Sequence, residues 1–187
     1  MAAIYIFRHG QTVDNQNHTF SGFRNSDLTP DGEAEAKTIG EQLKDVPVNK
    51  AYISDQIRSK HTLELVLNGY HGHGVQIKED PRIKERDYGQ LTGQNKDEIA
   101  KKHPSEYPLW HRSYDVAPPG GESVKDVEKR VLAFLNDEAP TWKKNDVIFI
   151  SAHGNSIRPM RKYFEHLTNE EMCSYEYTPA KVFHYTI

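Results

Sequence analysis

Two histidines follow apolar segments that are far apart in the sequence. His9 comes after residues 3–7 and Arg8, and His153 comes directly after residues 146–152. Each histidine precedes a glycine, which lets the backbone turn sharply and approach a ligand closely. An imidazole in such a position can attack a phosphorus atom and hold the phosphoryl group as a phosphohistidine.

Two arginines and one glutamate complete a set suited to that chemistry. Arg8 precedes His9, and Arg58 lies near the start of a predicted helix, 56–67. Guanidinium groups match phosphate oxygens, stay charged at any working pH and stabilise phosphoryl transfer. Glu85 follows the third predicted strand, and we expect it to supply the proton for the leaving oxygen. The residues therefore predict phosphoryl transfer through a phosphohistidine.

A metal site is the rival interpretation of the histidines. His9 and His153 would then be ligands together with His71 and His73. The two arginines argue against it, because fixed positive charges are costly beside a divalent cation. Residues 71–74 are more simply a solvated loop, and a histidine after a strand is often only a polar terminus. We therefore expect no metal.

Predicted strands and helices alternate along the chain. The strands are expected at 3–7, 50–54, 75–78, 146–152 and 181–186. The helices are expected from Pro30 to before Pro47, and at 56–67, 96–102, from Ser123, and at about 156–166. This alternation predicts an α/β fold in three layers, a mostly parallel sheet with helices on both faces. Sites in such sheets form beyond the carboxyl ends of the strands, so His9 and His153 should meet there.

The length and the prolines indicate how the chain is organised. A chain of 187 residues is expected to form one domain, 1–187. Residues 81–121 contain Pro104, Pro108, Pro118 and Pro119 and have weak periodicity. We expect this segment to be an excursion that covers the site.

Composition limits the classes of partner. The net charge of −3, the pI of about 6.4 and the mean hydropathy of −0.80 offer no broad cationic surface, so neither nucleic acid nor membrane is expected. The longest apolar runs are far shorter than the ~20 residues of a membrane span. Cys173 is the single cysteine, which suits a reducing compartment and a small buried side chain. We expect a cytoplasmic protein that binds a small phosphorylated anion.

Four segments resemble a known family. Residues 8–12, RHGQT, and 152–158, AHGNSIR, resemble the histidine phosphatase superfamily. Residues 85–96, ERDYGQLTGQNK, and 110–119, WHRSYDVAPP, resemble more narrowly the cofactor-dependent phosphoglycerate mutases. The resemblance covers nearly the whole chain. It implies a phosphoglycerate mutase-like fold and interconversion of 3-phosphoglycerate and 2-phosphoglycerate, primed by 2,3-bisphosphoglycerate without a metal.

The resemblance also implies roles for individual residues. His9 would be the phosphorylated nucleophile, Glu85 the general acid and base, and Arg8, Arg58 and His153 would grip the phosphoryl group. The residues implied to contact phosphate or substrate are Thr12, Asn15, Ser21, Gly22, Gly154 and Asn155. Those implied to hold the rest of the phosphoglycerate, including its carboxylate, are Tyr88, Lys96 and Arg112.

The sequence departs from the mutase pattern in two places. His111 precedes Arg112 where the mutases usually have paired arginines, so substrate affinity is expected to fall as the pH rises. The chain ends at Ile187, just after the last predicted strand, whereas the mutases usually continue into a tail that closes the site. The insertion before Glu122 is also short. With less of the chain over the site, water is expected to reach the phosphoenzyme more readily.

These departures leave other functions open. The first alternative is a metal-independent, phosphohistidine-forming phosphomonoesterase of broad specificity. A second is a phosphate-binding module without catalysis, which is disfavoured because every predicted catalytic residue is present. The sequence leaves monomer or homodimer open.

Overall fold

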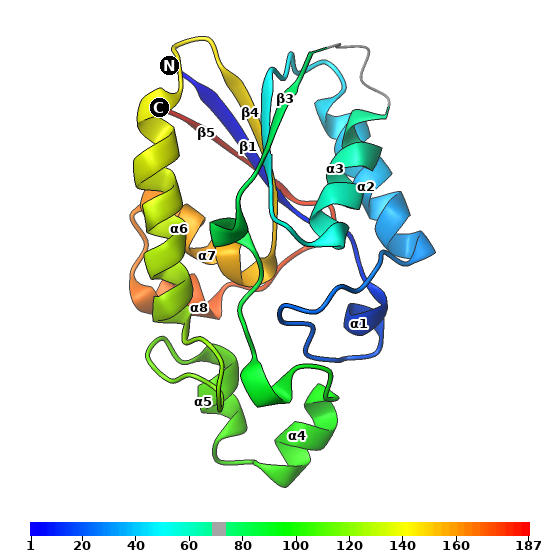
Figure 1. The fold of residues 1–187 in the computed structure, drawn as a ribbon, viewed down its shortest axis with the longest axis vertical. Coiled ribbons are helices and arrows are strands. Elements are labelled where there is room, and N and C mark those ends of the chain that lie inside the picture. The colour runs from blue at the N-terminus through cyan, green and yellow to red at the C-terminus, as the bar shows by residue number, and fades with distance from the viewer. Residues whose placement is uncertain (69–73) are drawn as a thin grey trace.

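The computed structural model describes residues 1–68 and 74–187, which form a five-stranded sheet in the order β3-β2-β4-β1-β5 (Figure 1). The strands are β1 (Ala3–Arg8), β2 (Lys50–Ile53), β3 (Gln76–Glu79), β4 (Val147–Ala152) and β5 (Val182–Thr186). The first four strands in the order run parallel, and β5 pairs antiparallel with β1. The predicted mostly parallel sheet is confirmed.

Helices cover both faces of the sheet. The longer ones are α2 (Pro30–Leu43), α3 (Ile57–Leu67), α6 (Val124–Glu138) and α7 (Gly154–Glu165). The shorter ones are α1 (Val13–Gln16), α4 (Lys96–Lys102), α5 (Tyr107–Arg112) and α8 (Asn169–Ser174). Single 3-10 turns span Pro81–Ile83, Gly89–Leu91 and Ala139–Thr141. None of the described helices is long and apolar enough to cross a membrane.

Alternate residues of the central strands face two separate cores. Ile148 and Ile150 of β4 pack in a cluster with Phe134 of α6, whereas Phe149 between them packs in another with Ile39 of α2. This period of two follows from the pleat of a strand. Together with the helices on either side in Figure 1, it confirms the three-layer α/β architecture.

The predicted caps define the starts of two helices. Thr29 accepts a hydrogen bond from the Gly32 amide with Pro30 at the first position of α2. Ser123 and Asp126 form a reciprocal capping box at the start of α6. The sequence signal was sufficient here because capping is a local interaction.

Several elements differ from the prediction. A polar loop was expected where α1 forms, and α5 and α8 were not predicted; helices of four to six residues carry too little periodicity to be recognised. β3 begins at Gln76 rather than at residue 75, and α7 begins at Gly154 rather than at about 156. The predicted loop at 69–74, with His71 and His73, lies almost wholly outside the described residues.

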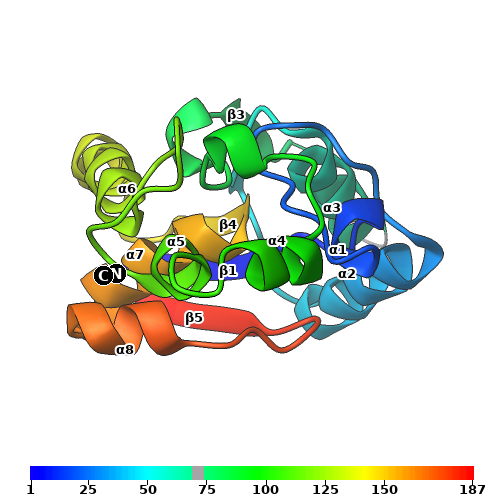
Figure 2. The same cartoon turned by 90° about the horizontal axis from the view of Figure 1, so that it is seen from below.

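Residues 81–121 lie beyond the carboxyl ends of the strands. Figure 2, seen from below, shows α4 and α5 in front of the ends of β1 and β4. Tyr88, Leu91 and Ile99 of this segment form a small core together with Phe20 from the N-terminal part of the chain. We call residues 81–121 the cover.

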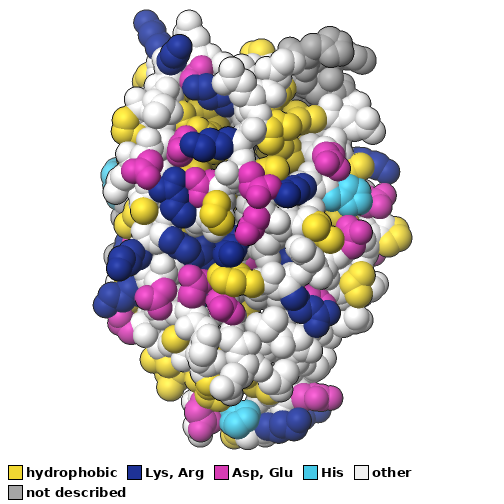
Figure 3. Space-filling view, in the orientation of Figure 1, with side chains coloured by type: hydrophobic (Ala, Val, Ile, Leu, Met, Phe, Trp, Pro, Cys, Tyr) yellow, Lys and Arg dark blue, Asp and Glu magenta, His cyan; other side chains and the backbone are white. Residues whose placement is uncertain are grey.

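The charged side chains of one face are mixed in sign. Figure 3 shows Lys and Arg interspersed with Asp and Glu over the face seen in Figure 1. That face presents no large patch of positive charge alone.

Candidate active site

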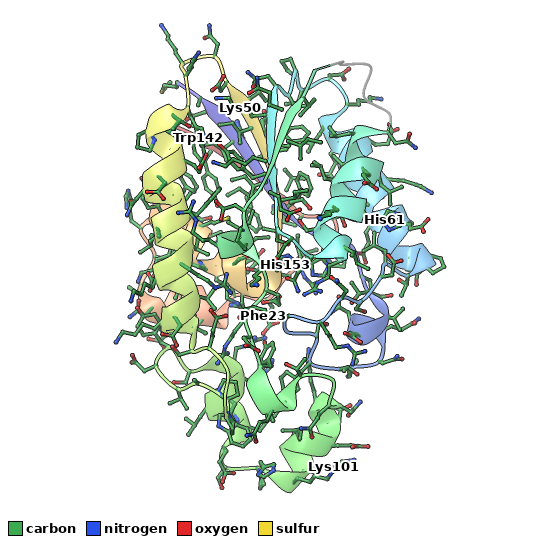
Figure 4. All side chains as sticks on the ribbon, viewed as in Figure 1. Phe23, Lys50, His61, Lys101, Trp142 and His153 are labelled. Atoms are coloured by element: carbon green, nitrogen blue, oxygen red, sulfur yellow. The ribbon has the colours of Figure 1, made fainter. Side chains whose placement is uncertain are left out.

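The two histidines meet at the carboxyl edge of the sheet. The His9 amide donates a hydrogen bond of 3.0 Å to the Ala152 carbonyl, which joins the ends of β1 and β4. The centroids of the His9 and His153 rings are 5.0 Å apart. Figure 4 shows His153 where the sheet ends and the cover begins. The juxtaposition predicted from the two strand ends is therefore observed.

His9 is held in the form of a nucleophile. Its Nδ1 lies 2.7 Å from the Gly10 carbonyl oxygen, and because a carbonyl only accepts, Nδ1 carries the ring proton. Burial, followed by the charges of Arg8 and Arg58, holds the pKa of His9 well below its ordinary value. The ring is therefore neutral at neutral pH, and the Nε2 lone pair is free to attack phosphorus.

Buried donors surround this imidazole. Arg58 is fully buried, and its terminal nitrogens donate to the carbonyls of Arg24 and Gly22 at 2.9 and 3.0 Å. His153 Nε2 lies 2.7 Å from the Ser54 hydroxyl. Six buried side-chain atoms of the described residues have no hydrogen-bond partner, and three of them belong to this set, namely Arg8 Nε, Arg58 Nε and His153 Nδ1. Unpartnered buried polar atoms are costly, and an oxyanion is a ligand suited to these.

Glu85 lies beside the two histidines. Its Oε1 accepts hydrogen bonds from the Arg86 amide at 2.7 Å and from the Asn155 amide and side chain at 3.2 and 2.8 Å. The ligand atoms of His9, Glu85 and His153 all lie within 4.8 Å of one another. This places a carboxyl group where it can exchange a proton with an oxygen bound to phosphorus at His9.

The same three side chains could hold a metal ion. However, Arg8 and Arg58 act against a positive charge on His9, and their charges oppose a divalent cation there for the same reason. The donor set therefore suits an anion better than a metal.

A network from α6 fixes the backbone that carries Glu85. Arg130 donates to the carbonyls of Arg82, Lys84 and Glu85 at 2.7 to 2.9 Å. It also pairs with Glu122, which accepts a hydrogen bond from the Asp87 amide. Arg130 has no recognisable motif, and the sequence analysis did not find it.

A cavity of about 220 Å³ opens over this edge. Its lining residues that were predicted for the site are Arg8, Asn15, Ser21, Gly22, Glu85, Tyr88, Lys96, Arg112, Gly154 and Asn155. His9, Arg58 and His153 are buried and are not among the lining residues. Thr12 is also buried, and its hydroxyl accepts from the Asn15 amide at 3.2 Å. Its predicted direct contact with substrate therefore stays a prediction, while its observed contact holds Asn15.

Sequence reasoning missed four further lining residues, Thr19, Arg158, Glu176 and Tyr177. The Tyr177 hydroxyl donates to the Gly154 carbonyl, and the Arg158 guanidinium lies 5.3 Å from the Tyr177 ring centroid. Arg158 stands within the motif 152–158, which was a usable signal. Glu176 and Tyr177 belong to the loop between α8 and β5. This loop therefore forms part of the cavity wall, although the sequence predicts a site that is less enclosed than in the mutases.

His111 also lines the cavity, next to Arg112. Burial and the charges of Arg112 and Lys96 lower the pKa of His111 to about 4. The imidazole is therefore neutral at neutral pH in the ligand-free protein. The loss of substrate affinity that the sequence predicts with rising pH would therefore occur near pH 4, where His111 loses its proton.

The fold and the site define an α/β protein with two buried histidines and a glutamate at the carboxyl edge of its sheet, and comparison with known proteins places it in a family. Residues 4–187 match the histidine phosphatase superfamily (branch 1), and the chain belongs to this family of enzymes. The 2,3-bisphosphoglycerate-dependent phosphoglycerate mutase of Nitrobacter winogradskyi is 41% identical over 177 residues, 92% of this chain and 86% of the relative. That of Rhizobium rhizogenes is 38% identical over 91% of this chain and 83% of its own.

Solved structures share the fold. Bacillus stearothermophilus YhfR aligns with a TM-score of 0.87 at 26% identity, over 98% of this chain and 90% of its own. A mycobacterial glucosyl-3-phosphoglycerate phosphatase aligns with a TM-score of 0.83 at 23% identity, over 97% and 90%. The phosphoglycerate mutase from Bacillus anthracis aligns at 0.75 and 22%, over 88% and 80%. The last two show similarity of fold alone.

Proposed function

We propose that this protein interconverts 3-phosphoglycerate and 2-phosphoglycerate through a phosphohistidine at His9, primed by 2,3-bisphosphoglycerate. The observation that carries the proposal is a second polar and cationic group in the same cavity. Tyr88, Lys96 and Arg112 line it together with Arg8 and Glu85. A substrate with a phosphoryl group alone would not need these additional side chains, whereas a substrate that also bears a carboxylate would.

The proposed reaction uses the groups already described. Phospho-His9 passes its phosphoryl group to the free hydroxyl of the bound phosphoglycerate while Glu85 accepts the hydroxyl proton. The bisphosphate that forms reorients in the cavity. His9 Nε2 then attacks the other phosphorus, Glu85 returns the proton to the leaving oxygen, and the isomer is released. Arg8, Arg58 and His153 hold the phosphoryl oxygens throughout, and no metal takes part.

The test supplies 3-phosphoglycerate with and without 2,3-bisphosphoglycerate and follows 2-phosphoglycerate and inorganic phosphate separately. We expect 2-phosphoglycerate to form much faster with the bisphosphate present. Release of phosphate without isomerisation would refute the mutase and establish the second candidate, a metal-independent phosphomonoesterase. That candidate is favoured by His111, which supplies no fixed charge where the mutases usually have an arginine.

The biological setting follows from the same proposal. A small phosphorylated anion is the proposed partner, without nucleic acid or membrane, and a cytoplasmic location remains a prediction from composition. Monomer and homodimer both remain open as assemblies.

A further inference from the structure

Glu176 places a second carboxylate, in addition to that of Glu85, in the wall of a cavity that is also lined by Arg and Lys side chains. It lies in the loop between α8 and β5 and lines the cavity together with Arg112. A terminal nitrogen of Arg112 donates to Glu176 Oε1 at 2.7 Å. Burial acts to raise the pKa of Glu176, but the hydrogen bond and charge of Arg112 outweigh it and lower the pKa. Glu176 is therefore ionised at neutral pH.

The contact between these residues competes with the proposed role of Arg112. An N–H of the guanidinium that points to Glu176 is not available in the same direction to a substrate carboxylate. Glu176 is the partner freer to move, because its side chain is 76% exposed whereas that of Arg112 is 35% exposed. Both residues also line a neighbouring cavity of about 610 Å³, which gives the glutamate room to turn away.

We infer that Glu176 limits the preference of the site for carboxylated phosphoesters by competing with the substrate carboxylate for Arg112. The inference rests on the proposed function, since it takes a phosphoester that bears a carboxylate as the substrate. In the ligand-free protein Glu176 holds Arg112 in place, and a bound carboxylate takes over that contact while Glu176 turns into solvent. A phosphoester without a carboxylate leaves the pair intact. Exposed ion pairs contribute little, so the exchange is cheap.

The test measures binding without turnover. All variants carry His9→Ala, and calorimetry follows the binding of 3-phosphoglycerate and of glycerol 3-phosphate, which has a hydroxymethyl group in place of the carboxylate. We expect Glu176→Gln to lower the Kd of 3-phosphoglycerate by about fivefold, the upper end for an exposed ion pair, and to change that of glycerol 3-phosphate by less than about twofold. Equal changes for the two ligands, or an unchanged Kd for 3-phosphoglycerate, would overturn the inference.

Two further variants separate the local contact from a general effect of charge. Glu170→Gln removes the same charge from α8, beside the neighbouring cavity but without an ion pair to Arg112 among the described residues, and should leave the ratio of the two Kd values unchanged. In an Arg112→Ala background, Glu176→Gln should also lose its effect on that ratio. A shift that persists there would contradict competition for Arg112. Because these titrations need no catalysis, failure of the proposed function shows itself separately, as absence of 2-phosphoglycerate in the turnover assay.

Discussion

Single residues at this site act through their charge states. Burial and the charges of Arg8 and Arg58 lower the pKa of His9 and keep it neutral, and in the proposed reaction the same arginines would bind the phosphoryl group on His9. His153 is buried beside them, and burial and the charge of Arg58 also lower its pKa. Two neutral imidazoles among fixed positive charges form a site that favours an anion over a proton.

His9→Ala should abolish the phosphoenzyme and lower turnover by roughly 10⁴-fold or more, because the nucleophile is lost while the arginines remain. The measurement incubates each protein with radiolabelled 2,3-bisphosphoglycerate and tests for an acid-labile, protein-bound phosphoryl group. His184→Ala, which changes an exposed histidine on β5, is the matched control and should be labelled like the unaltered protein. Labelling of the His9→Ala protein would show that another residue is the nucleophile; absence of label on the unaltered protein would favour a binding module.

At the scale of elements, the ends of the parallel strands opposite the site depend on one carboxylate. Asp146 accepts hydrogen bonds from the Asn49 side chain at 2.9 Å, Lys50 Nζ at 2.6 Å and the Lys143 amide at 2.8 Å. Burial acts to raise the pKa of Asp146, but these contacts outweigh it and lower the pKa to about 2. Asp146 thereby ties the start of β4 to the start of β2.

Asp146→Asn should lower the free energy of unfolding at pH 7 by about 2 kcal/mol, because hydrogen bonds to a charged group are lost. The folded-state pKa lies below the unfolded value, so this contribution is present above about pH 4 and is lost as the pH falls toward 2. Urea unfolding from pH 7 to pH 2 measures it. The difference between the two proteins should shrink across that acidic interval. Asp137→Asn, at an exposed residue of α6, is the control, and its effect on stability should be small. If the difference between the unaltered protein and Asp146→Asn stayed constant at all pH values, the stabilising role of ionised Asp146 would be contradicted.

At the scale of the whole molecule, the proposed mutase reaction requires the cover to keep water away from the phosphoenzyme. Phe20 comes from the loop between α1 and α2 and is fully buried against the cover, with its ring centroid 4.7 Å from that of Tyr88. Lys96 Nζ lies 5.6 Å from the Phe20 ring centroid. One side chain therefore joins the N-terminal loop to two residues of the proposed substrate site.

Phe20→Ala should raise the share of phosphoryl groups lost to water, because it loosens the cover. The measurement is the ratio of inorganic phosphate released to 2-phosphoglycerate formed, which does not depend on the amount of folded enzyme. Leu63→Ala removes a buried side chain from the core under α3 and costs about 2–5 kcal/mol of stability. It should leave the ratio unchanged. If both variants raise the ratio equally, general destabilisation explains it.

Residues close together in the sequence were the most predictable. The caps at Thr29 and Ser123 and the strands before His9 and His153 follow from local hydrogen bonding and from runs of apolar residues. Glu85 was placed correctly beside the histidines because it follows β3, and parallel strands end at one edge of the sheet.

The sequence by itself determined the layers of the fold and the edge at which the histidines, arginines and Glu85 meet, because periodicity and strand order encode both. Only the tertiary structure decided the protonation states of the titratable groups and the contacts that hold the site residues in place. The pKa of His111 depends on burial and on the charges of Arg112 and of Lys96 in another helix. The contacts of Arg130 with the Glu85 carbonyl and of Arg112 with Glu176 join residues 45 and 64 positions apart. Such contacts have no period and no local motif, since they arise only when separate elements pack together.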